Sequence, residues 1–452
     1  MRRRRSLAVV IAAFAAPDAC IGDTLGCGIS PEMQWGADDQ AEWLHSHSCP
    51  RVKMMADAGA TYYPDSSKVF DTKAAPIPAV PSCGHRVAMV FTWADWGKTA
   101  TGVVNYDEVV VPSYFRFWAE SAGMNVGLVD FLIFTTPKLY PHYETAVEGI
   151  PNVKIFMLED SNDPKGDDRA GIANFYAERL DIPDLVIDGE VLKDLKPMHG
   201  LVFESYLTEY THWGFGDIDL IYGDLSRFFT PLLGKHDIIT IHASEKPPLG
   251  LTNGLHLCKY GTLFAGQITV FKNNDYNRHL FEVIPDWKGV LPKKKKPGSR
   301  SRRHLSGKVE GRHRQLKYYG WAALIFDEKL MPQAILDSGR PGSMNDTGII
   351  IAQLTDQYNT PPNLVWSQGK LLVLDAESTC VAFEAALVHM MGVKYALKKA
   401  QVSKELFSEA ALASVKKSFA DGGRGGTRLA FPVKKGDIWG PLDDFTVPPR
   451  CT

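Results

Sequence analysis

Long apolar runs separated by helix-like segments constrain the fold of this 452-residue chain more than any other feature. The first run, at residues 85–94, is continuous rather than alternating, and two further strand-like runs occupy residues 126–135 and 153–159. Continuous runs of this length are typical of strands buried on both faces of a parallel sheet. Helix-like segments lie at 113–123 and 170–180. The alternation predicts the α/β class, with an α/β/α sandwich around a mainly parallel sheet.

The same alternation continues beyond residue 190. We expect helices at 198–210 and 225–233, and strands at 237–243 and 263–273. In open sheets of this kind, ligands bind beyond the carboxyl ends of the strands, so functional residues are expected there.

The pattern is less regular in the last third of the chain. Residues 364–375 have the pattern of a hairpin with its turn near Gln368-Gly369. Residues 380–400 look helical, and the Gly-rich tail that follows indicates a partly flexible end.

One short apolar and aromatic stretch, HWGFGDIDLIYGDLSRFF at 212–229, carries three aspartates. Asp217 and Asp219 are separated by one apolar residue, so in an extended chain both carboxylates leave the same face. Asp224 follows just before a predicted helix. Two carboxylates at the end of a strand suit a hard divalent cation bound to phosphate oxygens, because phosphates and waters complete its ligand shell.

An Asp-x-Asp motif alone also occurs by chance, often as a turn or a helix cap. The neighbours of Asp217 and Asp219 are apolar or aromatic. Buried carboxylates cost free energy of desolvation unless something compensates their charge. A bound cation is one such compensation, and the sequence therefore predicts metal ligands at these two positions.

The composition is that of an ordinary soluble globular protein, with 45% hydrophobic and 23% charged residues. The length allows one large domain with decorations, or two domains. A net charge of −2 gives no general reason to expect nucleic acid or an anionic membrane as partner.

The N-terminus begins with four consecutive arginines after Met1 and continues with an apolar stretch from Leu7 to Ala16. The apolar stretch is too short to span a bilayer, which takes about 20 residues. With Ala13-Phe14-Ala15 as a cleavage signal, we interpret residues 1–22 as a secretory signal peptide. The alternatives are a transit peptide or an unprocessed basic tail, and an uncleaved N-terminus would associate the chain with a membrane.

Residues 23–84 form a loop-rich extension without sustained periodicity. The chain has seven cysteines, which fit a secretory compartment and predict one or two disulfides of undetermined pairing. They are Cys20, Cys27, Cys49, Cys83, Cys258, Cys380 and Cys451.

A strongly basic stretch of low complexity occupies residues 293–317 and separates a core at 85–292 from a C-terminal part at 318–452. We interpret this stretch as a solvated, disordered loop. The alternatives are a contact to anionic polysaccharide, lipid headgroups or nucleic acid. A nucleic-acid site of the stacking type is disfavoured, because the stretch has no interleaved aromatic residues.

The region around the aspartates resembles a glycosyltransferase-like family of bacterial surface-polysaccharide proteins, which is known mainly as a domain of unknown function. The resemblance lies in DLKPMHGLVFESYL (194–207), HWGFGDIDLIYGDLSRFF (212–229), GQITVFKNN (266–274), the strand at 87–93 and the FLIFT run at 131–135. Together these stretches cover roughly residues 85–285 in the same order and at similar spacings.

The resemblance implies a nucleotide-sugar transferase of the GT-A (Rossmann-like) type. In such enzymes the Asp-x-Asp motif holds a divalent metal, Mn²⁺ or Mg²⁺, against the diphosphate of the donor, and Asp217 and Asp219 take that role here. Many of them add a histidine near the C-terminus, followed by a glycine and a lysine. His389, Gly392 and Lys394 look like that element, with His389 as third metal ligand and Lys394 as a phosphate contact. Otherwise His389 is a core or surface histidine on a helix.

Further donor and acceptor residues follow from the same comparison. Phe91, Thr92 and Trp93, at the end of the first strand, are expected to line the base and ribose pocket. Lys196 either supports that pocket or pairs structurally with an aspartate. Gly266 and Gln267 are expected to face the sugar or the acceptor.

An inverting enzyme would also need a carboxylate that takes the proton of the acceptor hydroxyl. Asp327 and Glu328 are the first candidates, with Asp375 and Glu377 as alternatives. A retaining enzyme requires no dedicated base, and the sequence does not decide between the two.

The sequence thus favours a metal-dependent glycosyltransferase with a UDP- or GDP-sugar donor and a glycan or glycoconjugate acceptor. The signal peptide, the cysteine-bearing extension and the basic stretch depart from the bacterial pattern. They favour the secretory pathway of a eukaryote: the Golgi or ER lumen, or secretion. The alternatives are a non-catalytic, lectin-like or scaffold protein of the same fold, and a metal-dependent phosphoesterase or nucleotidyltransferase.

Overall fold

We describe the fold from a computed structural model. The residues described are 61–63, 84–94, 111, 115–158, 168–187, 189–242, 266–291, 331–338, 347–351, 353–355, 364–367, 369–374, 381–389, 426–429 and 440–442.

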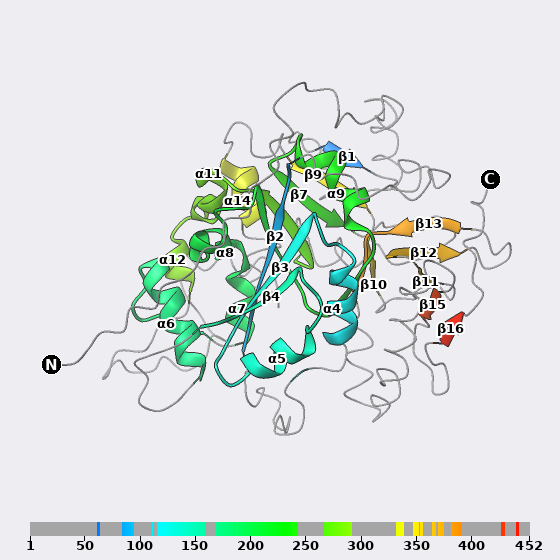
Figure 1. Cartoon of the computed structure of the whole chain (residues 1–452). Helices are drawn as coiled ribbons and strands as arrows, with labels where there is room; N and C mark the ends of the chain where they lie inside the picture. The colour runs from blue at the N-terminus through cyan, green and yellow to red at the C-terminus, as the bar shows by residue number, and fades with distance from the viewer. Residues whose placement is uncertain are drawn as a thin grey trace, which may run out of the picture.

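An eight-stranded sheet forms the centre of the molecule (Figure 1). From one edge to the other, its strands are β1 (Thr61–Tyr63), β9 (Thr347–Ile351), β7 (Ile238–His242), β8 (Ile268–Lys272), β5 (His212–Gly216), β2 (Val87–Trp93), β3 (Val129–Thr135) and β4 (Val153–Met157). All neighbours in this sheet are parallel except that β8 is antiparallel to both β5 and β7. The expected Rossmann-like sheet, mainly parallel, is confirmed.

Helices cover both faces of this sheet, and alternate side chains of β2 enter different cores. Met89 and Phe91 belong to one core, to which α4 (Phe115–Gly123), α5 (Tyr140–Ala146) and α9 (Leu225–Leu233) also contribute. Ala88 and Val90 belong to the other core, together with α6 (Asp168–Leu180), α7 (Gly189–Asp194) and α14 (Met331–Ser338). Figure 1 shows α4 and α6 on opposite sides of the sheet. The α/β/α sandwich is therefore confirmed.

The helix expected at 198–210 is wrong in its length. The chain forms three short turns instead: η3 (Lys196–Met198), α8 (His199–Val202) and η4 (Glu204–Tyr206). Phe203 interrupts them with φ −108° and ψ 20°. Its ring stacks on Phe134 of β3, with 4.0 Å between the ring centroids. We attribute the interruption to this tertiary packing, which outweighs local helix propensity.

The helical interpretation of residues 380–400 is wrong where the structure describes them. Residues 381–389 form the strands β13 (Val381–Ala385) and β14 (Leu387–His389). β13 pairs with β12 (Lys370–Leu374), and β14 pairs with β6 (Leu220–Tyr222). β6 is distant from β14 in the sequence. A local apolar pattern does not reveal such pairing.

The predicted hairpin at 364–375 is confirmed. β11 (Leu364–Ser367) and β12 are antiparallel with Ser367 opposite Lys370, so two residues connect them. Gly369 has φ +74°, which glycine adopts without strain. The hairpin belongs to a five-stranded sheet with β13, β15 (Gly426–Leu429) and β16 (Gly440–Leu442), which lies to one side of the sandwich in Figure 1.

A three-stranded sheet connects distant parts of the chain through β10 (Gln353–Thr355), β14 and β6. Short helices follow β8: α11 (Asp275–Arg278), η6 (Leu280–Val283) and α12 (Trp287–Val290). The sequence did not predict β1, β9 or α14. Since β1 lies within 23–84 and β9 within 318–452, the main sheet takes strands from both sides of the predicted core at 85–292.

Several sequence predictions lie outside the described residues: the signal peptide at 1–22, the seven cysteines, the basic loop at 293–317 and the helical pattern beyond residue 389. Among the helices that the structure describes, none combines the length and apolar character needed to cross a membrane.

Strand β5, which leads to the aspartates, is held from one side by a close contact with α8. A β-carbon added at Gly200 of α8 would lie 2.4 Å from Cε2 of Trp213, a residue of β5 that is fully buried. Glycine at this position therefore permits the helix and the strand to pack directly.

We predict that Gly200→Ala destabilises the protein by about 1 to 3 kcal/mol, the usual cost of overpacking a core. In an open helix the same change would be stabilising by about 1 kcal/mol. Urea unfolding followed by circular dichroism measures the difference. Gly234→Ala is the matched control, because its β-carbon would lie 3.5 Å from His85 Nε2, an ordinary contact. Equal stability of Gly200→Ala and the wild type would contradict this account.

Candidate metal centre

The two aspartates lie between two strands that belong to different sheets. β5 ends at Gly216, and β6 begins at Leu220, so Asp217 and Asp219 stand in the short connection beyond the carboxyl end of β5. The backbone N–H of Asp217 donates to the carbonyl of Gln267, at 3.2 Å. This bond extends the pairing of β5 with β8 by one residue and fixes the backbone from which Asp217 projects.

His389 is brought to the aspartates by strand pairing. It is the last residue of β14, and in the antiparallel ladder it stands opposite Leu220, the residue after Asp219. The N–H of Gly223 also donates to the carbonyl of Ala386, at 2.8 Å, which continues the contact past the end of β6. The position of His389 is therefore set by backbone hydrogen bonds.

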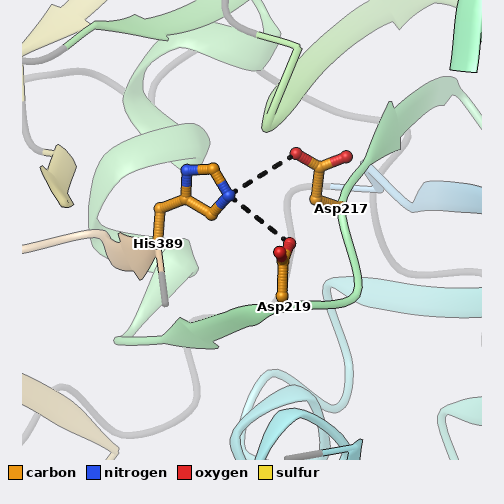
Figure 2. Close-up of side chains that lie close together, drawn as sticks. All are labelled: Asp217, Asp219 and His389. Carbon is orange, nitrogen blue, oxygen red and sulfur yellow. Dashed lines mark ion pairs between the residues drawn. The ribbon is translucent and has the colours of Figure 1, made fainter. Parts of the chain in front are cut away.

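The three side chains point toward one another (Figure 2). His389 Nε2 lies 3.4 Å from Asp219 Oδ1 and 3.9 Å from Asp217 Oδ2. One ligand atom from each residue lies within 4.8 Å of the others. Asp219 and His389 are each 5% exposed, and Asp217 is partly exposed. Among the described residues, Asp217, Asp219 and His389 are the three histidine and acidic side chains that lie close enough together to bind one metal ion.

The donor set fits a divalent cation. Two carboxylate oxygens and one imidazole nitrogen supply three ligands on one side of a common point, and water or phosphate oxygens would complete the shell. Mn²⁺ and Mg²⁺ both take carboxylate and phosphate oxygens, and Mg²⁺ prefers an all-oxygen shell. Two carboxylates this close together, of which Asp219 is buried, are costly in free energy without a cation to compensate them. The prediction that Asp217, Asp219 and His389 come together is confirmed; the identity of the ion is a proposal.

Lys196 lies against Asp217 on the side away from His389. Its Nζ is 2.7 Å from Asp217 Oδ1, and it donates to the carbonyl of Gly266 at 2.9 Å. The lysine side chain is 12% exposed. Of the two roles expected for Lys196, the structure shows the pairing with an aspartate.

A buried polar residue that the sequence analysis did not identify supports the far end of β6. Asn125 donates from Nδ2 to the carbonyl of Gly223 at 3.1 Å and accepts from the N–H of Leu225 at 2.8 Å. It thereby fixes the turn between β6 and α9. A single asparagine at the end of a helix-like segment gives no signal of this contact, which spans about a hundred residues of sequence.

The third aspartate of the motif has a structural role. Asp224 Oδ1 accepts from the N–H of Ser226 at 3.1 Å, so Asp224 is the N-cap of α9.

The three residues expected to line the base pocket do not share one wall. Phe91 is 3% exposed, and its ring contacts that of Trp118 edge-on, with 5.3 Å between centroids. Thr92 leaves the opposite face of β2, and its Oγ1 lies 2.7 Å from the hydroxyl of Tyr176. Trp93 is partly buried and packs against the same core as Phe91. A pocket at this strand end remains a prediction.

The residues expected to face the sugar lie beside the metal centre. Gly266 accepts a hydrogen bond from Lys196, and the carbonyl of Gln267 accepts one from Asp217. Gln267 Oε1 is buried and has no hydrogen-bond partner among the described residues. The predicted residues Asp327, Glu328 and Lys394, with the alternatives Asp375 and Glu377, lie outside the described residues.

Two neighbouring groups remain uncharged at neutral pH. Burial raises the pKa of Tyr222, and the charges of Asp217 and Asp219 raise it further. Burial also lowers the pKa of His199 to about 3, with a smaller contribution from Lys196. Neither group therefore adds a charge to the ion pair of Lys196 and Asp217.

Comparison with known proteins does not identify an activity. A model of a family described as "Family of unknown function (DUF6625)" matches residues 110–296, which include the aspartates. No curated protein matches the sequence.

Three solved structures are similar in part. Mouse xyloside xylosyltransferase 1 in its apo form is 9% identical, with 68% of this chain and 97% of that chain covered and a TM-score of 0.34. The apo form of the glycosyltransferase GlyE of Streptococcus pneumoniae is 12% identical, covering 46% and 41%, with a TM-score of 0.23. The 4-diphosphocytidyl-2C-methyl-D-erythritol synthase of Anaerococcus prevotii is 8% identical, covering 59% and 87%, with a TM-score of 0.27. Because these TM-scores are low, we infer function from the geometry of the site.

We predict that Asp219→Asn and His389→Gln each weaken Mn²⁺ binding by more than about tenfold, which corresponds to about 1.4 kcal/mol. The first change removes the negative charge of a ligand carboxylate, and the second removes the imidazole nitrogen. Isothermal titration calorimetry with MnCl₂ measures the affinity.

The matched control for this titration is Asp224→Asn, which makes the same chemical change seven residues from Asp217. Asparagine also serves as a helix N-cap, so α9 should persist and Mn²⁺ binding should be unchanged. Wild-type affinity in Asp219→Asn would show that the ion is not bound here.

Proposed function

We propose that the protein is a metal-dependent glycosyltransferase that moves a sugar from a nucleotide-diphosphate sugar to a hydroxyl group of a glycan or glycoconjugate. The observation that carries the proposal is the meeting of Asp217, Asp219 and His389 beyond the carboxyl end of β5. In open α/β sheets ligands bind at that end. A divalent ion held there by three protein ligands has room for the oxygens of a diphosphate.

The reaction breaks the bond between the anomeric carbon of the sugar and an oxygen of the diphosphate. The bonding electrons stay on that oxygen, so negative charge develops on the leaving group. A bound divalent ion would supply Lewis-acid stabilisation of this charge. The protein's part is to hold Asp217, Asp219 and His389 in position before the reaction begins, which the β5–β8 and β6–β14 ladders do.

The residues next to the candidate metal centre indicate where the sugar and the acceptor would bind. Gly266 and Gln267 lie next to Asp217, so we propose that the buried amide oxygen of Gln267 binds a hydroxyl of the sugar or of the acceptor. For an inverting reaction we propose Asp327 or Glu328 as the base that takes the proton of the acceptor hydroxyl. Lys394 is proposed as a further contact to the donor phosphates.

The proposal includes a compartment and a donor class. The predicted signal peptide at 1–22 and the seven cysteines support our proposal that the protein acts in the secretory pathway. For the donor we propose a UDP- or GDP-sugar, with Mn²⁺ or Mg²⁺ as the ion. The near-neutral charge of the whole chain does not favour nucleic acid as a partner.

We predict that one nucleoside diphosphate raises the melting temperature of the protein only when Mn²⁺ is present. A ligand that binds the folded state alone stabilises it by mass action, by about 2.7 kcal/mol at a hundred times its Kd. Differential scanning fluorimetry with UDP, GDP and CMP, each with and without MnCl₂, tests this. The responding nucleotide names the donor class.

Asp219→Ala should abolish the metal-dependent shift, whereas Asp224→Asn should retain it. No shift with any nucleotide would favour a non-catalytic binding protein. Metal-dependent hydrolysis of a phosphate ester, without transfer of sugar, would favour a phosphoesterase.

A further inference from the structure

The carboxylate of Asp217 is shared between two partners of different kinds. Oδ1 receives the ammonium group of Lys196 at 2.7 Å, while Oδ2 faces Nε2 of His389 at 3.9 Å. The oxygen that is turned toward the other two metal ligands is thus not the one that binds the lysine. A metal ion on Oδ2 and the ammonium on Oδ1 can be present at the same time, separated by one carboxylate group.

Lys196 is held at this place by the surrounding fold. It belongs to η3, and the next turn, α8, is anchored by Gly200 against Trp213 and by His199, whose Nδ1 lies 3.2 Å from the carbonyl of Val90. The ammonium also donates to the carbonyl of Gly266 at 2.9 Å. Since its side chain is only 12% exposed, the charge of Lys196 is poorly screened by solvent.

This fixed positive charge acts on any cation that binds next to it. The ammonium group of Lys196 lies 2.7 Å from Asp217 Oδ1, so it offsets part of the negative charge of the two aspartates. The ammonium attracts Asp217 and orients it, which favours metal binding slightly, because an aspartate has few side-chain torsions to fix. It also repels a divalent ion across one carboxylate, where the low local dielectric strengthens the repulsion. We expect the repulsion to be the larger effect, because orienting Asp217 fixes only a few torsions, whereas the two positive charges lie close together where solvent screens them poorly.

We propose that Lys196 is a built-in counter-cation that makes tight binding of the divalent ion depend on the diphosphate of the donor. Without the donor, the lysine neutralises part of the charge of the aspartates and keeps metal affinity low. The oxygens of the diphosphate restore the negative charge and add ligands, so ion and donor bind cooperatively. This inference rests on the proposed function, and in it Lys196 acts on the ion through its charge, across the carboxylate of Asp217.

Lys196→Gln tests the proposal, because glutamine can still donate to Gly266 and lacks the charge. We expect Mn²⁺ alone to bind the variant about tenfold more tightly than the wild type, a difference of about 1.4 kcal/mol. The factor by which UDP or GDP improves Mn²⁺ affinity should fall correspondingly. Titration of the full-length protein with MnCl₂, followed by the electron paramagnetic resonance signal of free Mn²⁺, measures both quantities.

Two further variants separate charge from structure. Lys196→Arg keeps the charge and should retain the wild-type affinity and cooperativity. Lys193→Gln removes an equal charge from an exposed position of α7, three residues earlier, and should change neither. Thermal unfolding establishes that each variant folds, and Lys196→Met serves as the uncharged variant if Lys196→Gln does not.

A fall in Mn²⁺ affinity in Lys196→Gln would overturn the proposal, because the lysine would then act only by orienting Asp217. An unchanged affinity would overturn it as well. In both cases the wild type still binds Mn²⁺, so the proposed function stands. Failure of the wild type to bind Mn²⁺ with UDP or GDP present would overturn both proposals.

Discussion

The pairing of β6 with β14 is the interaction on which the candidate site depends. β5 places Asp217 and Asp219 at the carboxyl end of the main sheet. The chain then leaves that sheet and forms β6, which pairs with β14 from the C-terminal part of the chain. This second ladder carries His389 to Asp219. Loss of the ladder would leave two carboxylates close together and partly desolvated, with neither the imidazole nor a complete metal site to compensate them.

The site also shows how charge is distributed around a buried acidic pair. Asp219 is directed toward His389, whereas Asp217 divides its two oxygens between His389 and Lys196. The lysine in turn is bound to Gly266, at the start of the segment that leads into β8. One ammonium group thus connects the candidate metal ligand Asp217 with the segment that leads into β8.

Much of the main sheet was predictable from the sequence, because the strand-like runs at 85–94 and 126–135, which contain β2 and β3, are long and are separated by helical patterns. Asp217 and Asp219 were predictable because acidic residues within an apolar run need compensation. The strand that carries His389 was not, since its apolar residues fit a helix as well as a strand, and only pairing with β6 decides between them. The contacts of Asn125 were beyond prediction for the same reason, because they join residues far apart in sequence. For Lys196 the sequence predicted pairing with an aspartate as one of two roles, but it did not identify Asp217 as the partner.

The central claim is that Asp217, Asp219 and His389 hold one divalent ion together with a diphosphate. Crystals grown with MnCl₂ and UDP or GDP, and measured at the manganese absorption edge, test it most directly. The account predicts an anomalous peak within bonding distance of Asp217 Oδ2, Asp219 Oδ1 and His389 Nε2, with phosphate oxygens on its open side and Lys196 still on Asp217 Oδ1. A peak elsewhere, or bound nucleotide with no metal between these three residues, would contradict it.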